Sequence, residues 1–255
     1  MKRSSRVLLL TLPWAVSVGA TPASAAQDAE RSGVLVISGA NNHHWEFTSS
    51  ELEALLRESG KFHVETTYEP AATLARPEGL AAFDAFVLDY NGPRWGAEAE
   101  RGFLDAVRAG AGVVVVHAAD NAFPGWEEYE LLVGNTWREG VSGHGRIHPF
   151  DVEIVDHEHP VTRGLLDIPA HPDELYHGLI GAPGAAHRVL ARAMSTKESD
   201  GSGQLEPVVF AGEYGGARVF HTTLGHVWRG AEDSHSSPRS TWVISMAESS
   251  TASAR

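Results

Sequence analysis

The sequence of 255 residues contains no cysteine. This absence excludes disulfide bonds, thiolate metal ligands and a cysteine nucleophile. It also argues against a lipid-modified amino terminus, because that modification is made on cysteine. Any metal ligand or catalytic group of the protein must therefore be a histidine, a carboxylate or another oxygen or nitrogen donor.

Basic residues are scarce relative to acidic ones. The chain has 20 Lys and Arg against 33 Asp and Glu, which gives a formal net charge of -13. A polyanion would meet net repulsion from such a chain, so we predict no nucleic-acid partner. We also predict no nucleotide cofactor.

An apolar run long enough to span a membrane is also missing from the amino terminus. Residues 7–20 are mostly apolar but fall short of the ~20 residues that a spanning helix needs. Basic residues precede this run, and Ala23, Ser24 and Ala25 form a small-x-small cleavage site. We therefore expect residues 1–25 to be a signal peptide, the mature protein to begin near Ala26, and the protein to be exported to the periplasm or beyond without stable membrane insertion. An uncleaved membrane anchor is the alternative.

Histidine, in contrast, is abundant, with 14 residues. Neutral imidazole is both a metal ligand and a proton carrier near neutral pH, so the positions of these residues decide what they do. The chain that remains after residue 25 is long enough for one large α/β domain, which we place at residues 32–242. Residues 243–255, rich in serine and alanine, are expected to form either a disordered tail or a divergent carboxyl terminus.

The first 120 residues alternate predicted strands with predicted helices. Apolar or alternating runs indicate strands at residues 33–38, 62–66, 85–89 and 112–116, and apolar stripes indicate helices at residues 48–59 and 97–109. This alternation predicts an α/β fold with an open, mainly parallel, flavodoxin-like sheet flanked by helices. Further strand-like stretches at residues 150–155, 187–193, 207–212 and 218–222 are expected to complete the sheet of a single domain.

Ligands of open parallel sheets bind beyond the carboxyl ends of the strands, so the residues that follow each strand are candidates for a site. The first strand is followed by Asn42, His43, His44 and Trp45, the fourth by His117, and the last by His226. Intervening loops add His144 between two glycines, and the segment Asp173, Glu174, Leu175 and Tyr176. These positions bring histidines and carboxylates toward one edge of the predicted sheet.

Four of these segments together resemble the ThuA-like family of trehalose-utilisation proteins. The resemblance covers about residues 33–229, and its most specific pieces are residues 112–118, 159–162, 173–176 and 216–226. It implies a fold like that of class I glutamine amidotransferases and a role in carbohydrate catabolism. True amidotransferases carry a cysteine nucleophile on the turn where this chain has His117, so no glutaminase activity is expected.

The candidate residues divide into three roles. We predict that His117, His144 and His226 hold a divalent metal such as zinc, because three neutral imidazoles leave a position open for substrate. His44, Glu174 and Tyr176 are the predicted catalytic groups, which would move protons. Asn42, His43, Trp45 and Asp173 are predicted to bind substrate, with Trp45 and Trp137 as aromatic faces for a sugar ring. Because Asp173 and Glu174 are adjacent, only one should enter the pocket, and we expect this to be Glu174.

Less specific interpretations remain beside these roles. A histidine at the end of a buried strand is often bonded to backbone, and adjacent acids are often solvated.

Two functions are consistent with the sequence. One is an enzyme, a hydrolase, lyase or isomerase, that acts on a glycoside or keto-sugar. The other is a non-catalytic protein that binds a small carbohydrate.

Overall fold

The computed structural model of the protein describes residues 31–230, which belong to a single unit of the chain. The predicted signal peptide, the predicted domain end at Trp242 and the predicted tail lie outside the described residues. Within residues 31–230, the structure contains no helix long and apolar enough to cross a membrane.

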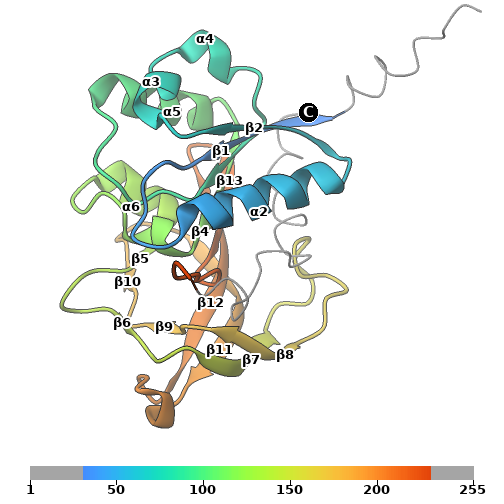
Figure 1. Cartoon of the computed structure of the whole chain (residues 1–255), viewed down its shortest axis with the longest axis vertical. Coiled ribbons are helices and arrows are strands. Elements are labelled where there is room, and N and C mark those ends of the chain that lie inside the picture. Colours follow the sequence, from blue (N-terminus) through green and yellow to red (C-terminus); the bar gives the residue numbers. More distant parts are fainter. Residues whose placement is uncertain (1–30, 231–255) are drawn as a thin grey trace, which may run out of the picture. The chain divides into compact units, whose positions relative to one another are not determined.

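A nine-stranded sheet forms the framework of residues 31–230 (Figure 1). Five strands run parallel, in the order β2 (Phe62–Thr67), β1 (Ser32–Ile37), β3 (Ala85–Leu88), β4 (Gly112–Val116) and β13 (Ala217–Thr222). Four more extend the sheet by antiparallel pairing, in the order β12 (Gln204–Tyr214), β11 (His187–Ser195), β7 (His148–Ile154) and β8 (Ile168–Asp173). The predicted α/β fold with an open sheet is confirmed.

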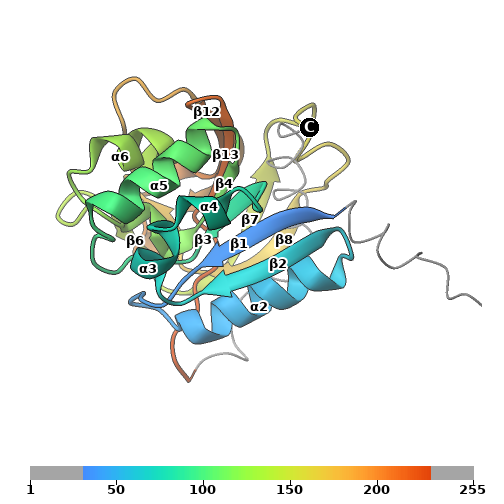
Figure 2. The ribbon, with the colours of Figure 1, turned by 90° about the horizontal axis from the view of Figure 1, so that it is seen from above.

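Helices cover both faces of the parallel part of the sheet (Figure 2). Helix α2 (Trp45–Glu58) lies on one face. The opposite face carries α3 (Pro70–Leu74), α4 (Pro77–Leu80), α5 (Ala97–Arg108) and α6 (Glu127–Val133). The remaining short elements are η1 (His117–Asn121), β5 (Asn135–Thr136), β6 (Gly143–His144), β9 (Tyr176–His177), β10 (Ile180–Gly181) and η2 (Lys197–Ser199).

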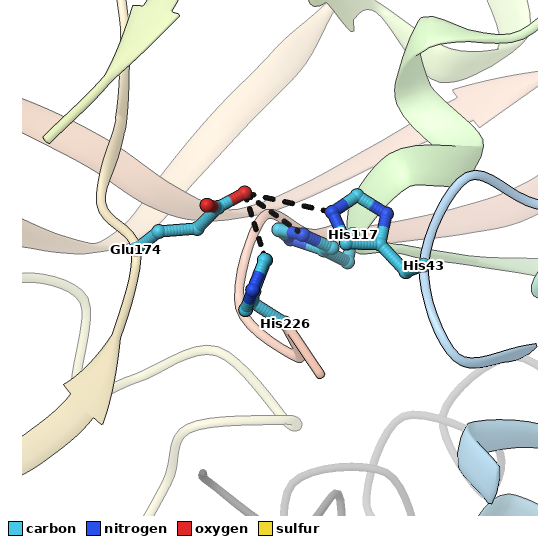
Figure 3. Close-up of side chains that lie close together, drawn as sticks. All are labelled: His43, His117, Glu174 and His226. Atoms are coloured by element: carbon cyan, nitrogen blue, oxygen red, sulfur yellow. Dashed lines mark ion pairs between the residues drawn. The ribbon is translucent and has the colours of Figure 1, made fainter. Parts of the chain in front are cut away.

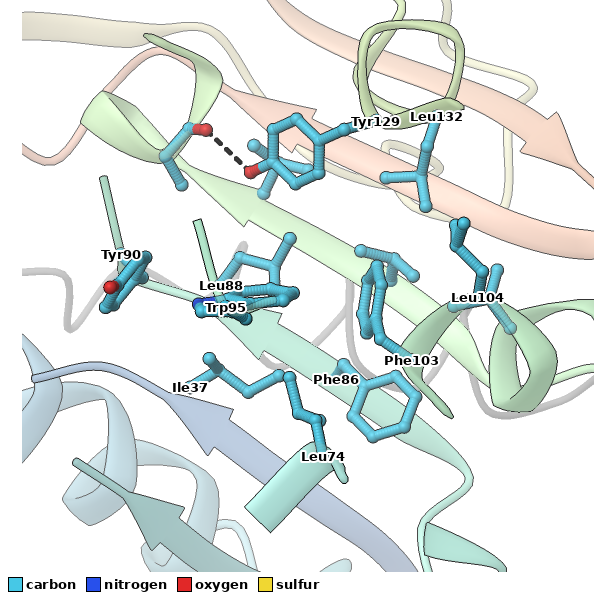
Figure 4. Packing of buried hydrophobic residues seen from close by; sticks show 14 of the residues in the cluster. Ile37, Leu74, Phe86, Leu88, Tyr90, Trp95, Phe103, Leu104, Tyr129 and Leu132 are labelled. Carbon is cyan, nitrogen blue, oxygen red and sulfur yellow. Dashed lines mark hydrogen bonds between the residues drawn. The ribbon is translucent and has the colours of Figure 1, made fainter. Parts of the chain in front are cut away.

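Each face of the sheet has its own apolar core. Val34 and Val36 of β1 pack on the side of α2, whereas Leu35 and Ile37 pack on the side of α5. Figure 4 shows the second of these cores, where Phe103 of α5 lies among side chains from the strands. Because successive side chains of a strand point to opposite faces, burial on both faces produces the unbroken apolar runs seen in the sequence.

Helix α2 and strand β8 differ from the sequence-based expectation in ways that have a clear physical reason. Helix α2 begins at Trp45 rather than near Thr48, because the Thr48 hydroxyl donates to Asp89 Oδ2 (2.6 Å) instead of capping the helix. Strand β8 was not predicted, since it contains Pro169 and Pro172. Proline donates no backbone hydrogen bond and is tolerated here because β8 is the last strand of the sheet.

Candidate active site

Three histidines and one glutamate meet beyond the carboxyl ends of the parallel strands (Figure 3). His43 follows β1, His117 follows β4 and His226 follows β13. Glu174 follows the edge strand β8, and Asp173 at the end of that strand accepts a hydrogen bond from the backbone of Gly225, in the segment that follows β13. The sheet therefore gathers residues that are far apart in the sequence.

The Glu174 carboxylate lies at the centre of this group, which we call the His/Glu cluster (His43, His117, Glu174 and His226). Its Oε1 atom is 2.8 Å from His226 Nδ1, and 3.6 Å from the Nε2 atoms of both His43 and His117. One ligand atom from each of the four residues lies within 4.8 Å of the others. All four side chains are 5% exposed or less, so the cluster is shielded from bulk water.

His117 is fixed by an unusual backbone conformation and by a hydrogen bond. It occupies the left-handed region (φ 46°) at the junction of β4 and η1, a conformation that costs energy for a residue with a side chain. Its Nδ1 donates to the Thr223 carbonyl at 2.6 Å, which leaves Nε2 unprotonated in the neutral ring and directed at the cluster. Gly225, which adjoins His117, has a positive φ of 130°, a backbone conformation that residues with a side chain rarely adopt.

His43 is oriented by a chain of polar side chains. Its Nδ1 lies 3.1 Å from Asn41 Oδ1, and the Asn41 amide in turn donates to Asp89 Oδ1 at 3.2 Å. Burial raises the pKa of Asp89 to about 7, although bonds from Thr48 and Asn41 oppose this rise. The Nδ1 of His43 is thus the donor, and its Nε2 faces Glu174.

Asp173 supports the cluster from behind. Its Oδ1 accepts the backbone N–H of Glu174 (2.8 Å) and of His226 (3.3 Å), and its Oδ2 accepts that of Gly225 (2.8 Å). Burial raises the pKa of this carboxyl, but the hydrogen bond from His171 and the charge of His117 outweigh burial and lower it overall. Asp173 therefore holds two chain segments together, while Glu174 enters the cluster.

The buried charges of the cluster depend on one another. Burial raises the pKa of Glu174, but hydrogen bonds from His117, His226 and His43 outweigh it and keep the pKa far below its usual range. Burial lowers the pKa of His117, but Glu174 and Asp173 together raise it to about 9. For His43 burial dominates and lowers the pKa to about 4. The carboxylates therefore favour a positive charge on the His117 side of the cluster.

Two further predicted site residues adjoin the cluster. Tyr176 is buried, and its hydroxyl lies 3.1 Å from His117 Nε2. His144 places Nδ1 3.3 Å from Glu174 Oε2, but its side chain is 45% exposed. Of the three histidines predicted to share a metal, His117 and His226 lie in the cluster, and His144 stands beside it, next to the second carboxylate oxygen.

The remaining predicted residues lie outside the cluster. Asn42 is exposed and its Oδ1 accepts from Asn91 at 2.6 Å. The His44 ring stacks on Phe47 at 5.9 Å, and the Trp45 ring packs on Tyr68 at 5.6 Å. Trp137 lies nearer, with its ring 6.5 Å from that of Tyr176.

Two residues of the site were not recognised in the sequence. Asp89 directly follows β3, so the rule that pointed to His43 and His117 also applies to it. Trp228 lies two residues after His226, and its ring is 4.8 Å from the rings of both His43 and His226. Nothing in the sequence around Trp228 indicates that its segment folds back over His43.

The donor set of the cluster fits a divalent transition metal. Imidazole and carboxylate suit zinc and similar ions, and His117 and His43 each direct their second nitrogen at an oxygen acceptor, as metal-bound histidines do. Bonds of ~2.0–2.2 Å require ligand atoms within ~4.2 Å of each other, so the side chains would draw together slightly around an ion.

Comparison with known proteins identifies the family. The model of the ThuA family, described as trehalose utilisation, matches residues 33–236. The chain is also similar to a solved ThuA-like protein from Parabacteroides merdae, with 32% identity, a TM-score of 0.76, and coverage of 88% of this chain and 90% of that one. The protein therefore belongs to the ThuA family.

More distant solved structures share the fold alone. A ThuA-like protein from Bacteroides uniformis is 15% identical, with a TM-score of 0.63 and coverage of 94% of this chain and 95% of that one. Protein STM1381 of Salmonella typhimurium is 14% identical, with a TM-score of 0.58 and coverage of 86% and 99%. No curated protein sequence matches the chain. The family supports a role related to carbohydrate utilisation.

Proposed function

We propose that this protein is a metal-dependent enzyme that acts on a glycoside or keto-sugar. The observation that carries the proposal is the convergence of three histidine nitrogens on one buried carboxylate, from four separate segments of the chain. Buried charges are costly unless they are compensated, so an arrangement of this kind is expected to hold a cation. The family description, trehalose utilisation, supports a sugar as substrate.

His43, His117, His226 and Oε1 of Glu174 are the proposed ligands. Among the predicted ligands, this set replaces His144 with His43, which was predicted to bind substrate but lies inside the cluster. It also adds Glu174, which was predicted to be a catalytic group. A divalent ion held by these four residues would polarise a carbonyl or hydroxyl oxygen of the sugar if it accepted that oxygen as a fifth ligand.

Proton transfer falls to the groups at the rim of the cluster. His144 is half exposed and lies 3.3 Å from Glu174 Oε2, so its ring can exchange protons with both substrate and solvent. The buried Tyr176 hydroxyl, beside His117, can donate a hydrogen bond to a substrate oxygen. Its pKa is raised well above the usual value by burial and by the negative charges of Asp120 and Glu174, so the phenol remains a donor. Proton movement next to a polarised carbonyl is common to the isomerisation and the eliminative cleavage of a keto-sugar.

The test combines metal analysis with a substrate screen. Purified full-length protein is expected to contain about one divalent ion per chain, and to convert at least one glycoside or keto-glycoside in a panel analysed by mass spectrometry. Glu174→Gln and His226→Asn should lose both properties. His157→Asn, which changes an exposed histidine, should lose neither. Tight sugar binding without metal or turnover would refute the enzyme and favour a carbohydrate-binding protein.

We also propose that the protein is exported. The support is the basic amino terminus, the short apolar run and the Ala23-Ser24-Ala25 site. Amino-terminal sequencing of protein from the periplasm or culture medium of its host should begin near Ala26. Recovery of the intact chain from the cytoplasm would contradict export.

A further inference from the structure

Trp228 is a half-exposed aromatic side chain in direct contact with the His/Glu cluster. Its indole ring is tilted by 31° over His43 and meets His226 edge-on at 76°, in both cases with centroids 4.8 Å apart. The side chain is nevertheless 42% exposed, whereas His43 and His226 are buried. A large apolar ring is thus presented to solvent beside a buried cluster of polar side chains.

The position of Trp228 is fixed by bonds on both sides. The backbone N–H of His44 donates to the Val227 carbonyl at 2.9 Å, and the Arg229 guanidinium forms an ion pair with Glu46 at 2.6 Å. Both contacts join the segment to the start of helix α2. The exposed ring is therefore held in place before any ligand arrives, which lowers the entropic cost of using it.

The partly exposed side chains that contact the cluster include an apolar ring and a polar one. Besides Trp228, His144 is a half-exposed neighbour of the cluster, and its Nδ1 faces Glu174 Oε2. A ligand that reaches the cluster past these two residues meets an aromatic face and an imidazole. A pyranose ring has matching surfaces, since its C–H bonds form an apolar face and its hydroxyl groups project from the ring edge.

We propose that Trp228 is the stacking platform for a closed pyranose ring of the substrate, and that the hydroxyls at the ring edge face His144 and the cluster. This inference rests on the proposed function, because it assigns the sugar to the same site. It goes further by specifying that the ligand contains a closed pyranose ring. Stacking selects ring-closed pyranosides, whereas a bound metal alone would also accept an open-chain polyol with the same kind of hydroxyl groups.

The experiment measures binding of methyl α-D-glucopyranoside, trehalose and the open-chain polyol sorbitol to the full-length, metal-loaded protein by calorimetry or ligand-observed NMR. Both pyranosides should bind better than sorbitol. Trp228→Leu should weaken pyranoside binding by about tenfold or more, and Trp228→Phe, which keeps an aromatic face, by only about threefold. Tyr68→Leu, which removes an exposed aromatic ring that packs on Trp45, should have no effect.

Three results would overturn the proposal that Trp228 is a stacking platform. They are equal binding of sorbitol and the pyranosides, unchanged pyranoside affinity in Trp228→Leu, and no pyranoside binding by the wild type. Metal content, measured in every variant, separates this inference from the proposed function. If Trp228→Leu keeps both metal and sugar affinity, only the platform fails. If the wild type binds no metal but its sugar affinity depends on Trp228, the metal-dependent enzyme fails and the platform stands.

Discussion

Two buried histidine-carboxylate groups lie close together in the chain but differ in character. One is the His/Glu cluster. The other is the pair of His221 and Asp120, whose Nε2 and Oδ2 atoms are 3.2 Å apart and whose side chains are both fully buried. His221 lies within strand β13, five residues before His226, and its ring stacks on Phe210 at 5.0 Å. Burial and pairing are common to both groups, so neither property identifies a site.

The difference lies in convergence and access. Three histidine nitrogens surround the Glu174 carboxylate, and the half-exposed side chains of His144 and Trp228 adjoin them. Asp120 and His221 form a single pair within the core, and their neighbour Tyr129 is also buried. The comparison teaches that a histidine within a strand serves packing, whereas histidines beyond the strand ends can combine into a site.

Removal of the central carboxylate should have the largest effect. Glu174→Gln keeps the size of the side chain but removes its charge, and should reduce turnover by about 10²–10⁴-fold and strip the metal. Metal analysis and single-turnover assays measure the two losses. Asp120→Asn is the matched control from the second group and should keep the metal. Retention of metal in Glu174→Gln would contradict a central role for this carboxylate.

Disruption of the second group should reduce stability instead. His221→Leu leaves the Asp120 carboxylate buried without its partner, which should lower the free energy of unfolding by about 3 kcal/mol. Urea denaturation measures this change, and metal content at low temperature should stay near one ion per chain. If His221→Leu folds with wild-type stability but loses its metal, the distinction between the two groups is wrong.

Removal of the side chain that orients His43 should have a smaller effect on the affinity for the metal. Asn41→Ala removes the acceptor of the His43 Nδ1 proton, and loss of such an orienting partner typically weakens metal binding by about 10–100-fold. Competition with a chelator gives the affinity. Asn121→Ala, which removes the amide at the end of η1 that bonds to Asn91 rather than to a cluster histidine, should leave the affinity unchanged. Equal losses in both variants would mean that loop order, not orientation of His43, controls the metal.

The smallest predicted effect is the dependence of the free energy of unfolding on pH. Burial raises the pKa of Asp89 from 3.8 to about 7, so the folded state binds a proton that the unfolded state releases above pH 4. The wild type should therefore lose stability as pH rises through this range, whereas Asp89→Asn has no proton to lose there. Between pH 6 and pH 8 the stability of the wild type should fall relative to Asp89→Asn by about 1.4 kcal/mol. Urea titrations with a chelator present test this, and a difference that is constant with pH would contradict it.

The sequence predicted the fold better than the site. Strands covered on both faces, such as β1 and β4, have short, unbroken apolar runs rich in β-branched residues, which favour a buried strand. Strand β8 is instead interrupted by prolines and depends on its pairing with β7. The rule that ligands bind beyond the carboxyl ends of parallel strands correctly placed His43, His117 and His226 at one edge of the sheet. It could not separate His43 from its neighbour His44, because the direction of adjacent side chains in a loop is set by tertiary hydrogen bonds such as that to Asn41.

The distribution of the His/Glu cluster along the chain, from residue 43 to residue 226, has a consequence for folding. No short fragment holds more than one of its four residues, so the affinity for an ion arises only when nearly the whole sheet is assembled. An ion that binds only the folded state at a concentration 1,000 times its dissociation constant adds about 4 kcal/mol to the free energy of unfolding. Metal occupancy is then a reporter of completed folding, and it should fall only under conditions in which part of the protein population is unfolded.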